Sequence, residues 1–482
     1  MNTKAQAGLI PIQNFNQGGL ADSKFSGIKD SLYKMTGFDP HSKPGILRTA
    51  QKLTAETTGT EPDEFCKVAI NSSNGAQYWC SSTSGKIWER PTTGTWRLVH
   101  TLTPAAGAAA ILGGAEYQGY IYLFTQSRIH RITVALADDN NWAVDCVEDW
   151  ATFGVTNASF HPHVEQNLVL YIGDGNQLAQ IDAGTFSANA LDIKTPLVIK
   201  SLGKIGTDVL LGTYVADNVT KTEIIRWNTW SISFTNSDPI DEVGINAFLQ
   251  GDNMVFVHAG TSGNIYTYNG ETLTLYKKIP GDYSPTATST VHPNSVANMG
   301  NEILFGVSNV TGNPSDQGVY RIGRHSRNYP YIMDLPYPIS QRSGGALVLT
   351  GIEIGAILSV GSLLYVAWKN DTTYGVDKLD YSNKLDGAYL ESRVMSVERE
   401  KLTTFQRFLV AYASLPASTA VTIQYDKNYA NDYTNTTEVT DTQRSIIYAE
   451  EGVEASVLQL KLLITASGNT APEIESAACF VT

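Results

Sequence analysis

The chain has 482 residues, a formal net charge of −13 at pH 7 and only 17% charged residues. This length exceeds what one compact core usually fills, so we expect one large domain with attachments. The negative charge argues against sequence-independent binding of nucleic acid, because such binding rests on Lys and Arg neutralising phosphates. We expect DNA at most to pass through or beside this protein.

Residues 1–60 are predicted to form an extended N-terminal arm. They are rich in glycine, proline and polar residues and contain no strand-like repeat. Such a segment cannot bury enough apolar surface to fold alone, so it should be ordered against the rest of the chain or a neighbouring subunit. Its expected assembly anchors are the apolar side chains Leu20, Phe25, Leu32, Tyr33, Met35 and Phe38.

The first residues, Met1 to Pro11, lack the charged start and the apolar core of a secretory signal. We therefore expect the chain to fold in the compartment where it is made. The longest apolar stretch, Gly351 to Trp368, is interrupted by polar residues and indicates two buried strands more readily than a membrane helix. No membrane anchor is expected.

Residues 61–390 are predicted to form a β-propeller of about seven blades. A hairpin of alternating aliphatic and aromatic residues recurs at intervals of roughly 40 to 60 residues, which is typical of four-stranded blades. The clearest copies are Thr83 to Trp88 and Thr261 to Tyr266. An irregular β-sandwich is the alternative. The predicted hairpins are Ala76 to Trp88, Tyr120 to Val134, Leu168 to Ile181, Val209 to Trp227, Met254 to Tyr268, Ile303 to Ile322 and Leu363 to Leu379.

Residues 391–482 are predicted to form a small C-terminal β-sandwich. Strands such as Phe408 to Tyr412, Val421 to Tyr425 and Leu458 to Ile464 alternate there with polar turns. The boundary leaves an alternative open, because Ala388 to Met395 could instead close the ring by completing the first blade.

Cysteine usage favours free thiols in a reducing compartment. The four cysteines have no metal-ligand spacing and no CxxC pair. Cys66 and Cys80 would face each other if Asn71 to Gly75 is a hairpin turn, so a bond between them remains an alternative.

Catalytic patterns are weak, and we expect no enzyme activity and no catalytic, cofactor or metal residues. Ser81 to Trp88 is similar in spacing to the aspartate-box hairpin of sialidase-like propellers, but Thr83 stands where the acid belongs. Hydrolysis of a glycoside would need two carboxylates at a fixed separation. No spacing selects a pair from the candidates Glu116, Asp174, Glu223, Asp252 and Glu302.

Three other groups of residues suggest binding only weakly. His161-Pro162-His163 and His292-Pro293 are explained better as turns between blades than as metal ligands. Asp138 to Asn141 with Asp145 lacks the glycine and glutamate of a calcium loop. The group at Arg321, Arg324, His325 and Arg327 fits a solvated loop at least as well as a phosphate site.

Trp227 and Trp230 could form a flat surface on which a ligand stacks, or they could be buried against the next blade. The pattern of alternating side chains favours the buried arrangement.

Both ends of the chain resemble a family. Near the N-terminus the motifs are Gly18-Gly19-Leu20, Gly37-Phe38-Asp39 and Pro44 to Arg48. Near the C-terminus they are Phe405 to Val410, Val421 to Asp426, Leu458 to Lys461 and Ala471 to Ile474. These segments resemble those of structural β-propeller proteins in the tails of bacteriophages. The motifs are short.

The resemblance implies a virion protein of a tail nozzle, hub or baseplate that serves genome ejection and is assembled in the host bacterial cytoplasm. It implies a homo-oligomeric ring, other tail proteins as partners, and no catalytic residues. The alternative is a propeller at the virion periphery that binds a host receptor or glycan, with a glycoside hydrolase as a more remote alternative.

Overall fold

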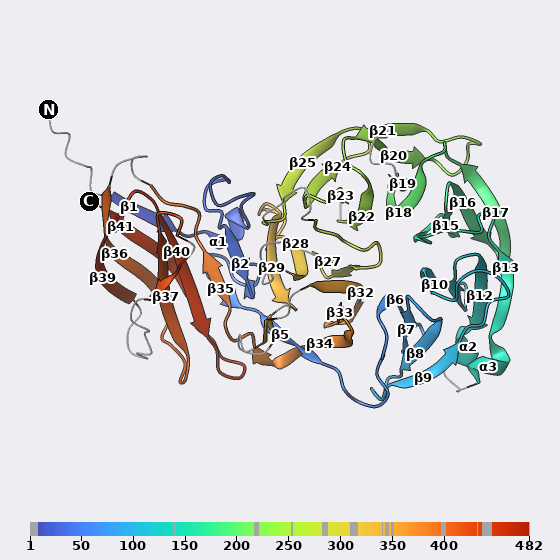
Figure 1. Ribbon diagram of the computed structural model, residues 1–482, viewed down its shortest axis with the longest axis horizontal. Coiled ribbons are helices and arrows are strands. Elements are labelled where there is room, and N and C mark those ends of the chain that lie inside the picture. Colours follow the sequence, from blue (N-terminus) through green and yellow to red (C-terminus); the bar gives the residue numbers. More distant parts are fainter. Residues whose placement is uncertain are drawn as a thin grey trace.

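The computed structural model describes residues 8–137, 141–215, 221–251, 254–281, 288–308, 317–339, 341–342, 347–348, 351–396, 402–430, 432–435 and 446–481. Most of these residues lie in strands. They form a ring of seven four-stranded blades with a two-layered β-domain beside it (Figure 1). The chain is therefore a β-propeller protein, as the recurring hairpins predicted.

Each blade is an antiparallel sheet, and in blades 1 to 6 the four strands follow in chain order from the ring axis outward. Blade 1 contains β6 (Cys66–Asn71), β7 (Gln77–Ser81), β8 (Lys86–Arg90) and β9 (Arg97–Thr101). Blade 2 contains β10 (Gly113–Tyr117), β11 (Tyr120–Phe124), β12 (Arg128–Thr133) and β13 (Val147–Thr152). The short helices α2 (Val134–Ala137) and α3 (Trp142–Asp145) lie between β12 and β13.

The next three blades repeat the plan. Blade 3 contains β14 (His163–Gln166), β15 (Val169–Asp174), β16 (Gln177–Asp182) and β17 (Thr185–Asp192). Blade 4 contains β18 (Val198–Ile205), β19 (Asp208–Tyr214), β20 (Thr222–Trp227) and β21 (Asn236–Ile240). Blade 5 contains β22 (Ile245–Gln250), β23 (Val255–Ala259), β24 (Asn264–Tyr268) and β25 (Leu273–Lys278).

Blade 6 contains β26 (Val296–Met299), β27 (Glu302–Val307), β28 (Gly318–Gly323) and β29 (Ile332–Pro338). A small hairpin, β30 (Gln341–Arg342) and β31 (Leu347–Val348), follows it. Blade 7 contains β32 (Ile352–Val360), β33 (Leu363–Asn370) and β34 (Thr373–Lys384). Each predicted hairpin corresponds to the two middle strands of one blade.

The ring is closed by a strand from the N-terminal part of the chain. The outermost strand of blade 7 is β5 (Gln51–Ala55), which pairs antiparallel with β34. Residues 51–55 of the predicted N-terminal arm are therefore part of the propeller, as its closing strand. The alternative in which 388–395 completes the first blade was wrong, because β35 (Tyr389–Glu391) pairs outside the ring.

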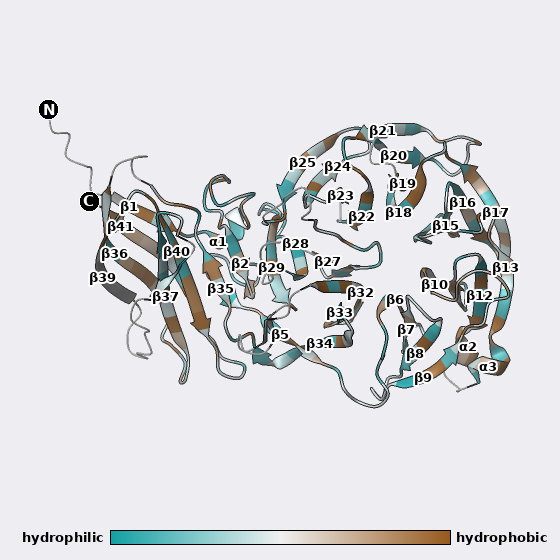
Figure 2. Ribbon diagram, viewed as in Figure 1, coloured by the Kyte–Doolittle hydropathy of each residue, from teal (hydrophilic) through white to brown (hydrophobic). Residues whose placement is uncertain are grey.

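Apolar side chains fill the junctions between neighbouring blades, so hydrophobic residues concentrate on the strands (Figure 2). At the junction of blades 7 and 1, Trp79 and Trp96 meet edge to face with ring centroids 6.0 Å apart, and Trp88 is buried beside them. Both faces of the middle strands are covered, which explains why β23 is buried along its whole length. Blade stacking is thus the main source of the core.

The second domain is a sandwich built from both ends of the chain. One sheet has the order β1-β41-β36-β39, with bounds Gly8–Ile12, Ile474–Val481, Thr403–Tyr412 and Ile446–Ala455. The other has the order β35-β40-β37-β38, in which β40 is Leu458–Thr465, β37 is Ala420–Lys427 and β38 is Thr434–Asn435. The sandwich predicted for 391–482 is therefore completed by β1.

One continuous sheet joins the propeller to the sandwich. Strand β2 (Lys34–Thr36) pairs parallel with β29 of blade 6 and antiparallel with β35. Near it lie α1 (Phe15–Gly18) and the two-stranded pair β3 (Phe38–Asp39) and β4 (Arg48–Thr49). A single apolar cluster runs from blades 5 and 6 through these elements into the sandwich.

A buried ionic cluster stabilises the same region, the contact of β29, β2 and β35 between propeller and sandwich, which we call the joint. The guanidinium of Arg321 on β28 lies 2.6 Å from Asp334 on β29, 2.9 Å from Glu302 on β27 and 3.0 Å from Asp39 on β3. Three carboxylates keep the pKa of Arg321 raised in spite of burial. The group at Arg321 to Arg327 is therefore not a free phosphate site, since its first member is committed to this cluster.

The arm anchors divide into two groups. Leu20, Leu32, Met35 and Phe38 are buried in the joint of their own chain, whereas Tyr33 is only partly buried. Phe25 is 59% exposed and contacts Lys24 and, at the edge of the sandwich, Tyr429, so its role as an assembly anchor stays a prediction. Residues 1–7 of the predicted arm lie outside the described residues.

Candidate functional site at the propeller axis

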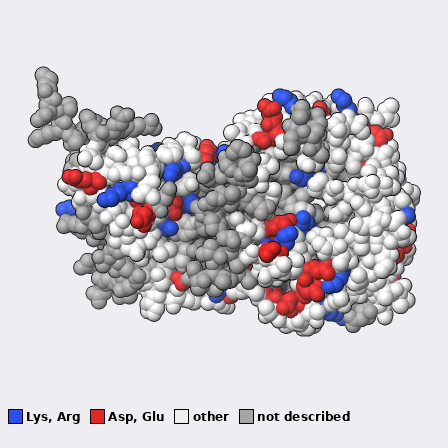
Figure 3. Space-filling view, in the orientation of Figure 1, with Lys and Arg blue, Asp and Glu red and all other residues white. Residues whose placement is uncertain are grey.

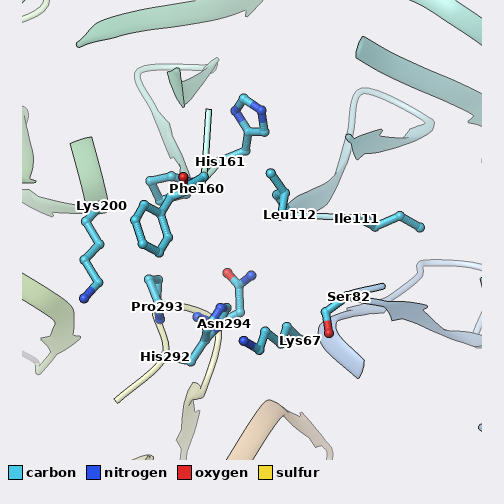
Figure 4. Close-up of a pocket in the computed structure, with 12 residues that line it drawn as sticks. Lys67, Ser82, Ile111, Leu112, Phe160, His161, Lys200, His292, Pro293 and Asn294 are labelled. Atoms are coloured by element: carbon cyan, nitrogen blue, oxygen red, sulfur yellow. Dashed lines mark hydrogen bonds between the residues drawn. The ribbon is translucent and has the colours of Figure 1, made fainter. Parts of the chain in front are cut away.

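A pocket of about 120 Å³ lies near the ring axis, where the innermost strands of the blades begin. Its walls include Lys67, Leu112, Phe160, Lys200, His292 and Asn294. Figure 4 shows Lys67 and Lys200 entering from opposite sides, with His292 and Asn294 between them. Residues distant in the sequence converge here because every blade presents its first strand to the axis.

Three polar side chains reach the axis from one recurring backbone feature. The innermost strands of blades 1, 4 and 5 each carry one residue without a partner in the register, namely Lys67, Lys200 and Asn246. Such β-bulges turn a side chain away from the regular alternation of a strand. They explain how polar groups leave the apolar junctions and meet near the axis.

Lys200 is a cation without a carboxylate partner among the described residues. Its ammonium donates a 2.6 Å hydrogen bond to Asn246 Oδ1. The rings of Phe160 and Tyr214 lie 5.5 and 5.1 Å from the nitrogen. Burial lowers the pKa of Lys200 to about 8, because a charged amine loses water there.

Lys67 is only partly neutralised. Its ammonium lies 3.1 Å from Glu353 on β32, and the same carboxylate lies 2.7 Å from Lys369. Burial opposes ionisation of Glu353, but the two lysines keep its pKa below the ordinary value. One carboxylate is therefore shared by two cations, and the axis carries an excess of positive charge.

The histidines near the axis are neutral at physiological pH. Burial lowers the pKa of His161 to about 4 and that of His258 to about 3. The pKa of His292 is lowered by burial and by Lys67 and Lys200. His161-Pro162 and His292-Pro293 both lie in connections between blades, which is the arrangement that the sequence favoured.

The predicted carboxylates do not come together. Glu116 accepts hydrogen bonds from the 72–73 turn, and Glu302 belongs to the Arg321 cluster. Asp174 is buried and accepts the backbone N–H of Val155, and burial raises its pKa to about 6. Glu223 accepts a hydrogen bond from the hydroxyl of Ser237. Asp252 lies outside the described residues.

The turn that resembles an aspartate box has no acid of its own, and a carboxylate from an earlier segment binds it instead. Glu64, which precedes β6, accepts hydrogen bonds from Ser81 and Ser84 at 2.5 Å and from Thr83 at 2.9 Å. Burial acts to raise its pKa, but these donors and Lys86 lower it to about 2. This carboxylate therefore stabilises a turn, and sequence reasoning missed it because it lies before the box.

Trp227 and Trp230 do not form one stacking surface. Trp227 is 3% exposed, packs edge to face on Tyr171 and donates its indole N–H to Ser231. Trp230 is 84% exposed and stands beside Ile232, which is fully exposed. The connection between β20 and β21 is thus an apolar projection rather than a flat platform.

The described part of the chain contains no metal-binding group and no disulfide. Within it, no three His, Cys, Asp or Glu side chains are grouped to hold a metal ion. All four cysteines carry free thiols, with Cys66 and Cys80 buried. Asp138 to Asn140 of the possible calcium loop lie outside the described residues. None of the described helices is long and apolar enough to span a membrane.

Charged side chains are sparse on one face of the molecule. Figure 3 shows acidic and basic groups in small mixed clusters separated by wide uncharged areas. The face in view thus carries no continuous basic stripe.

No family model matches the chain, and no curated protein matches it. Solved structures share its propeller architecture at low identity. Streptogramin B lyase is 13% identical over 69% of this chain and 98% of its own, with a TM-score of 0.45. The WD40 repeats of RRP9 are 10% identical over 69% of this chain and 99% of their own, with a TM-score of 0.47. An extracellular domain of the putative one component system BT4673 from B. thetaiotaomicron is 15% identical over 84% of this chain and 48% of its own, with a TM-score of 0.46.

Proposed function

We propose that this chain is a structural subunit of a bacteriophage tail that acts by assembly. The observation that carries the proposal is the continuous sheet through β29, β2 and β35, because it makes the propeller and the sandwich one stiff body. A stiff body with fixed surfaces suits a component of a nozzle, hub or baseplate. The partners would be other copies of the chain and other tail proteins.

The positions of the segments that resemble tail proteins support this proposal. Motif residues from the two ends of the chain pair with each other: Leu47 and Ile474 exchange backbone hydrogen bonds of 2.8 and 3.0 Å. Beside them, Arg48 and Lys43 contact the carboxylate of Glu473. The motifs therefore lie in the sandwich and in the N-terminal segments beside it.

Much of the described arm packs within its own chain, where Leu20, Leu32 and Met35 are buried, so its use as an assembly surface stays a prediction. The proposed surface is the projection between β20 and β21, where Trp230 and Ile232 are exposed and Phe234 is 39% exposed. Exposed apolar groups gathered in one place are typical of interfaces between proteins.

The test is the mass and projected shape of the purified chain, by light scattering after size exclusion and by negative-stain microscopy. We expect a closed ring with a central opening. The double variant Trp230→Ser, Ile232→Ser should dissociate it. Val144→Ser is the matched control, because Val144 is 82% exposed but lies away from this connection.

A monomer at every concentration tested, with the double variant unchanged, would contradict self-assembly through this surface. The exposed Trp230 favours a second candidate function, a propeller that binds a glycan or receptor at the virion periphery. A glycan array probed with the native chain and with Trp230→Ser distinguishes the two functions, because only the second requires saccharide binding that the variant loses.

A further inference from the structure

Lys200 holds a positive charge in a place where water is scarce. The ammonium has three N–H donors, and the structure assigns it one acceptor, Asn246 Oδ1. Asn246 is itself fixed, since its amide donates a 2.6 Å hydrogen bond to the carbonyl of Gly260. The donors of Lys200 that Asn246 does not use are therefore available to a ligand in the pocket.

Further donors come from the other side of the pocket. The backbone N–H of Asn294 donates to His292 Nδ1 at 3.3 Å, which places the proton of the neutral imidazole on Nε2. Lys67 adds an ammonium whose carboxylate partner, Glu353, is shared with Lys369. The wall thus offers N–H donors and excess positive charge.

The size of the pocket limits the ligand. A cavity of about 120 Å³ admits a tetrahedral oxyanion but not a nucleotide or a sugar chain. The pocket is also made by rigid elements, namely the bulges of the first strands and the two His-Pro connections. A site of this kind is largely formed before the ligand arrives.

We propose that the axial pocket binds a free inorganic oxyanion of the phosphate or sulfate class, held by Lys200 on one side and by Lys67 and His292 on the other. The anion supplies the charge partner that Lys200 lacks among the residues that the structure describes. It also ties the first strands of blades 1 and 4 across the axis. This inference does not depend on the proposed assembly in a phage tail.

The experiment is isothermal titration calorimetry of the full chain with inorganic phosphate at pH 7 and fixed ionic strength. We expect saturable binding that sulfate competes with, and a loss of affinity of about tenfold or more in Lys200→Met. Lys200→Arg keeps the charge and should retain most of the affinity. Lys221→Met is the matched control, because Lys221 is an exposed lysine of the same blade, paired with Asp241 at 3.2 Å.

Three outcomes would overturn the proposal. The first is the absence of saturable binding by the native chain, and the second is unchanged affinity in Lys200→Met. The third is competition by adenosine monophosphate as strong as that by phosphate, since a pocket for a free ion excludes the nucleoside. If Lys200→Met does not fold, the site is tested through its second lysine: the native chain should broaden the ³¹P resonance of phosphate and Lys67→Met should not, and equal broadening by both would overturn the proposal.

Discussion

At the scale of single residues, polar side chains in this propeller stabilise turns and gather near the axis. Glu64 accepts hydrogen bonds from a turn that has no carboxylate of its own. Lys200 lies at a β-bulge that directs its side chain to the axis. Both depend on neighbours that are remote along a blade or on the next blade. Their roles follow from the register of strands rather than from any local motif.

The carboxylate of Glu64 should make stability depend on acid. Its pKa in the folded chain, about 2, is below the ordinary value of 4.5, so its contribution is fully present above pH 4.5 and is lost as pH falls toward 2. Glu64→Gln should cost about 1 kcal/mol at pH 7, a value reduced for partial exposure. Chemical denaturation of both chains at pH 7 and pH 3 measures this.

The difference between the two chains should shrink at pH 3. Asp63→Asn is the control, since Asp63 contacts Lys86 but is 68% exposed. An equal difference at both pH values would show that Glu64 does not act through its charge.

At the scale of elements, ring closure depends on β5. Blade 7 gains its fourth strand only from residues 51–55, whose Leu53 joins the apolar cluster between blades 6 and 7. Its inner side chain, Leu53, is 8% exposed and pairs with Leu379 of β34. A short strand thus completes a large structure.

We expect Leu53→Asp to open the ring at blade 7. Burying a carboxylate in an apolar junction costs several kcal/mol, so exchange of amide hydrogens in β34 and β5 should accelerate by orders of magnitude. Hydrogen exchange with mass spectrometry measures this. Leu98→Asp is the control, because Leu98 lies on β9, an outermost strand, and is 45% exposed. Equal protection in both variants would contradict closure by β5.

The sequence predicted the blades well and the closure poorly, for a physical reason. The middle hairpins are marked by local alternation, as in β23, where Val255, Phe256 and Val257 are all buried. Strand β5 has five residues of ordinary composition, and its partner lies near the other end of the chain. The axial lysines were not predicted either, because one unpaired residue in a strand decides where Lys67 and Lys200 point.

At the scale of the whole molecule, the joint between propeller and sandwich has little room. Gly37, between β2 and β3, has φ 78° and donates its N–H to Leu335 of β29 at 2.8 Å. A Cβ at this position would lie 2.3 Å from Leu385. The backbone at Gly37 therefore passes between the two domains in direct van der Waals contact with its neighbours.

Gly37→Ala should destabilise the joint by more than the cost of its backbone conformation. Gly45→Ala is a matched control, because Gly45 has φ 74° but a Cβ there meets nothing within 4 Å. We expect about 1 kcal/mol for Gly45→Ala and about 2 to 4 kcal/mol for Gly37→Ala. Thermal unfolding measures the stability, and small-angle X-ray scattering measures whether the domains separate. Similar losses of stability in both variants would mean that the joint rearranges to accept the added methyl group.

The pairing of β5 with β34, and of β1 with β41, sets the order in which a nascent chain can fold. Translation makes β1 and β5 well before β41 and β34, so each of these strands must wait for its partner. Blades 1 to 6 can stack as they leave the ribosome, but the ring stays open until blade 7 appears, and the sandwich comes last. During that interval the early segments expose strand edges and apolar side chains, which makes them natural clients for chaperones.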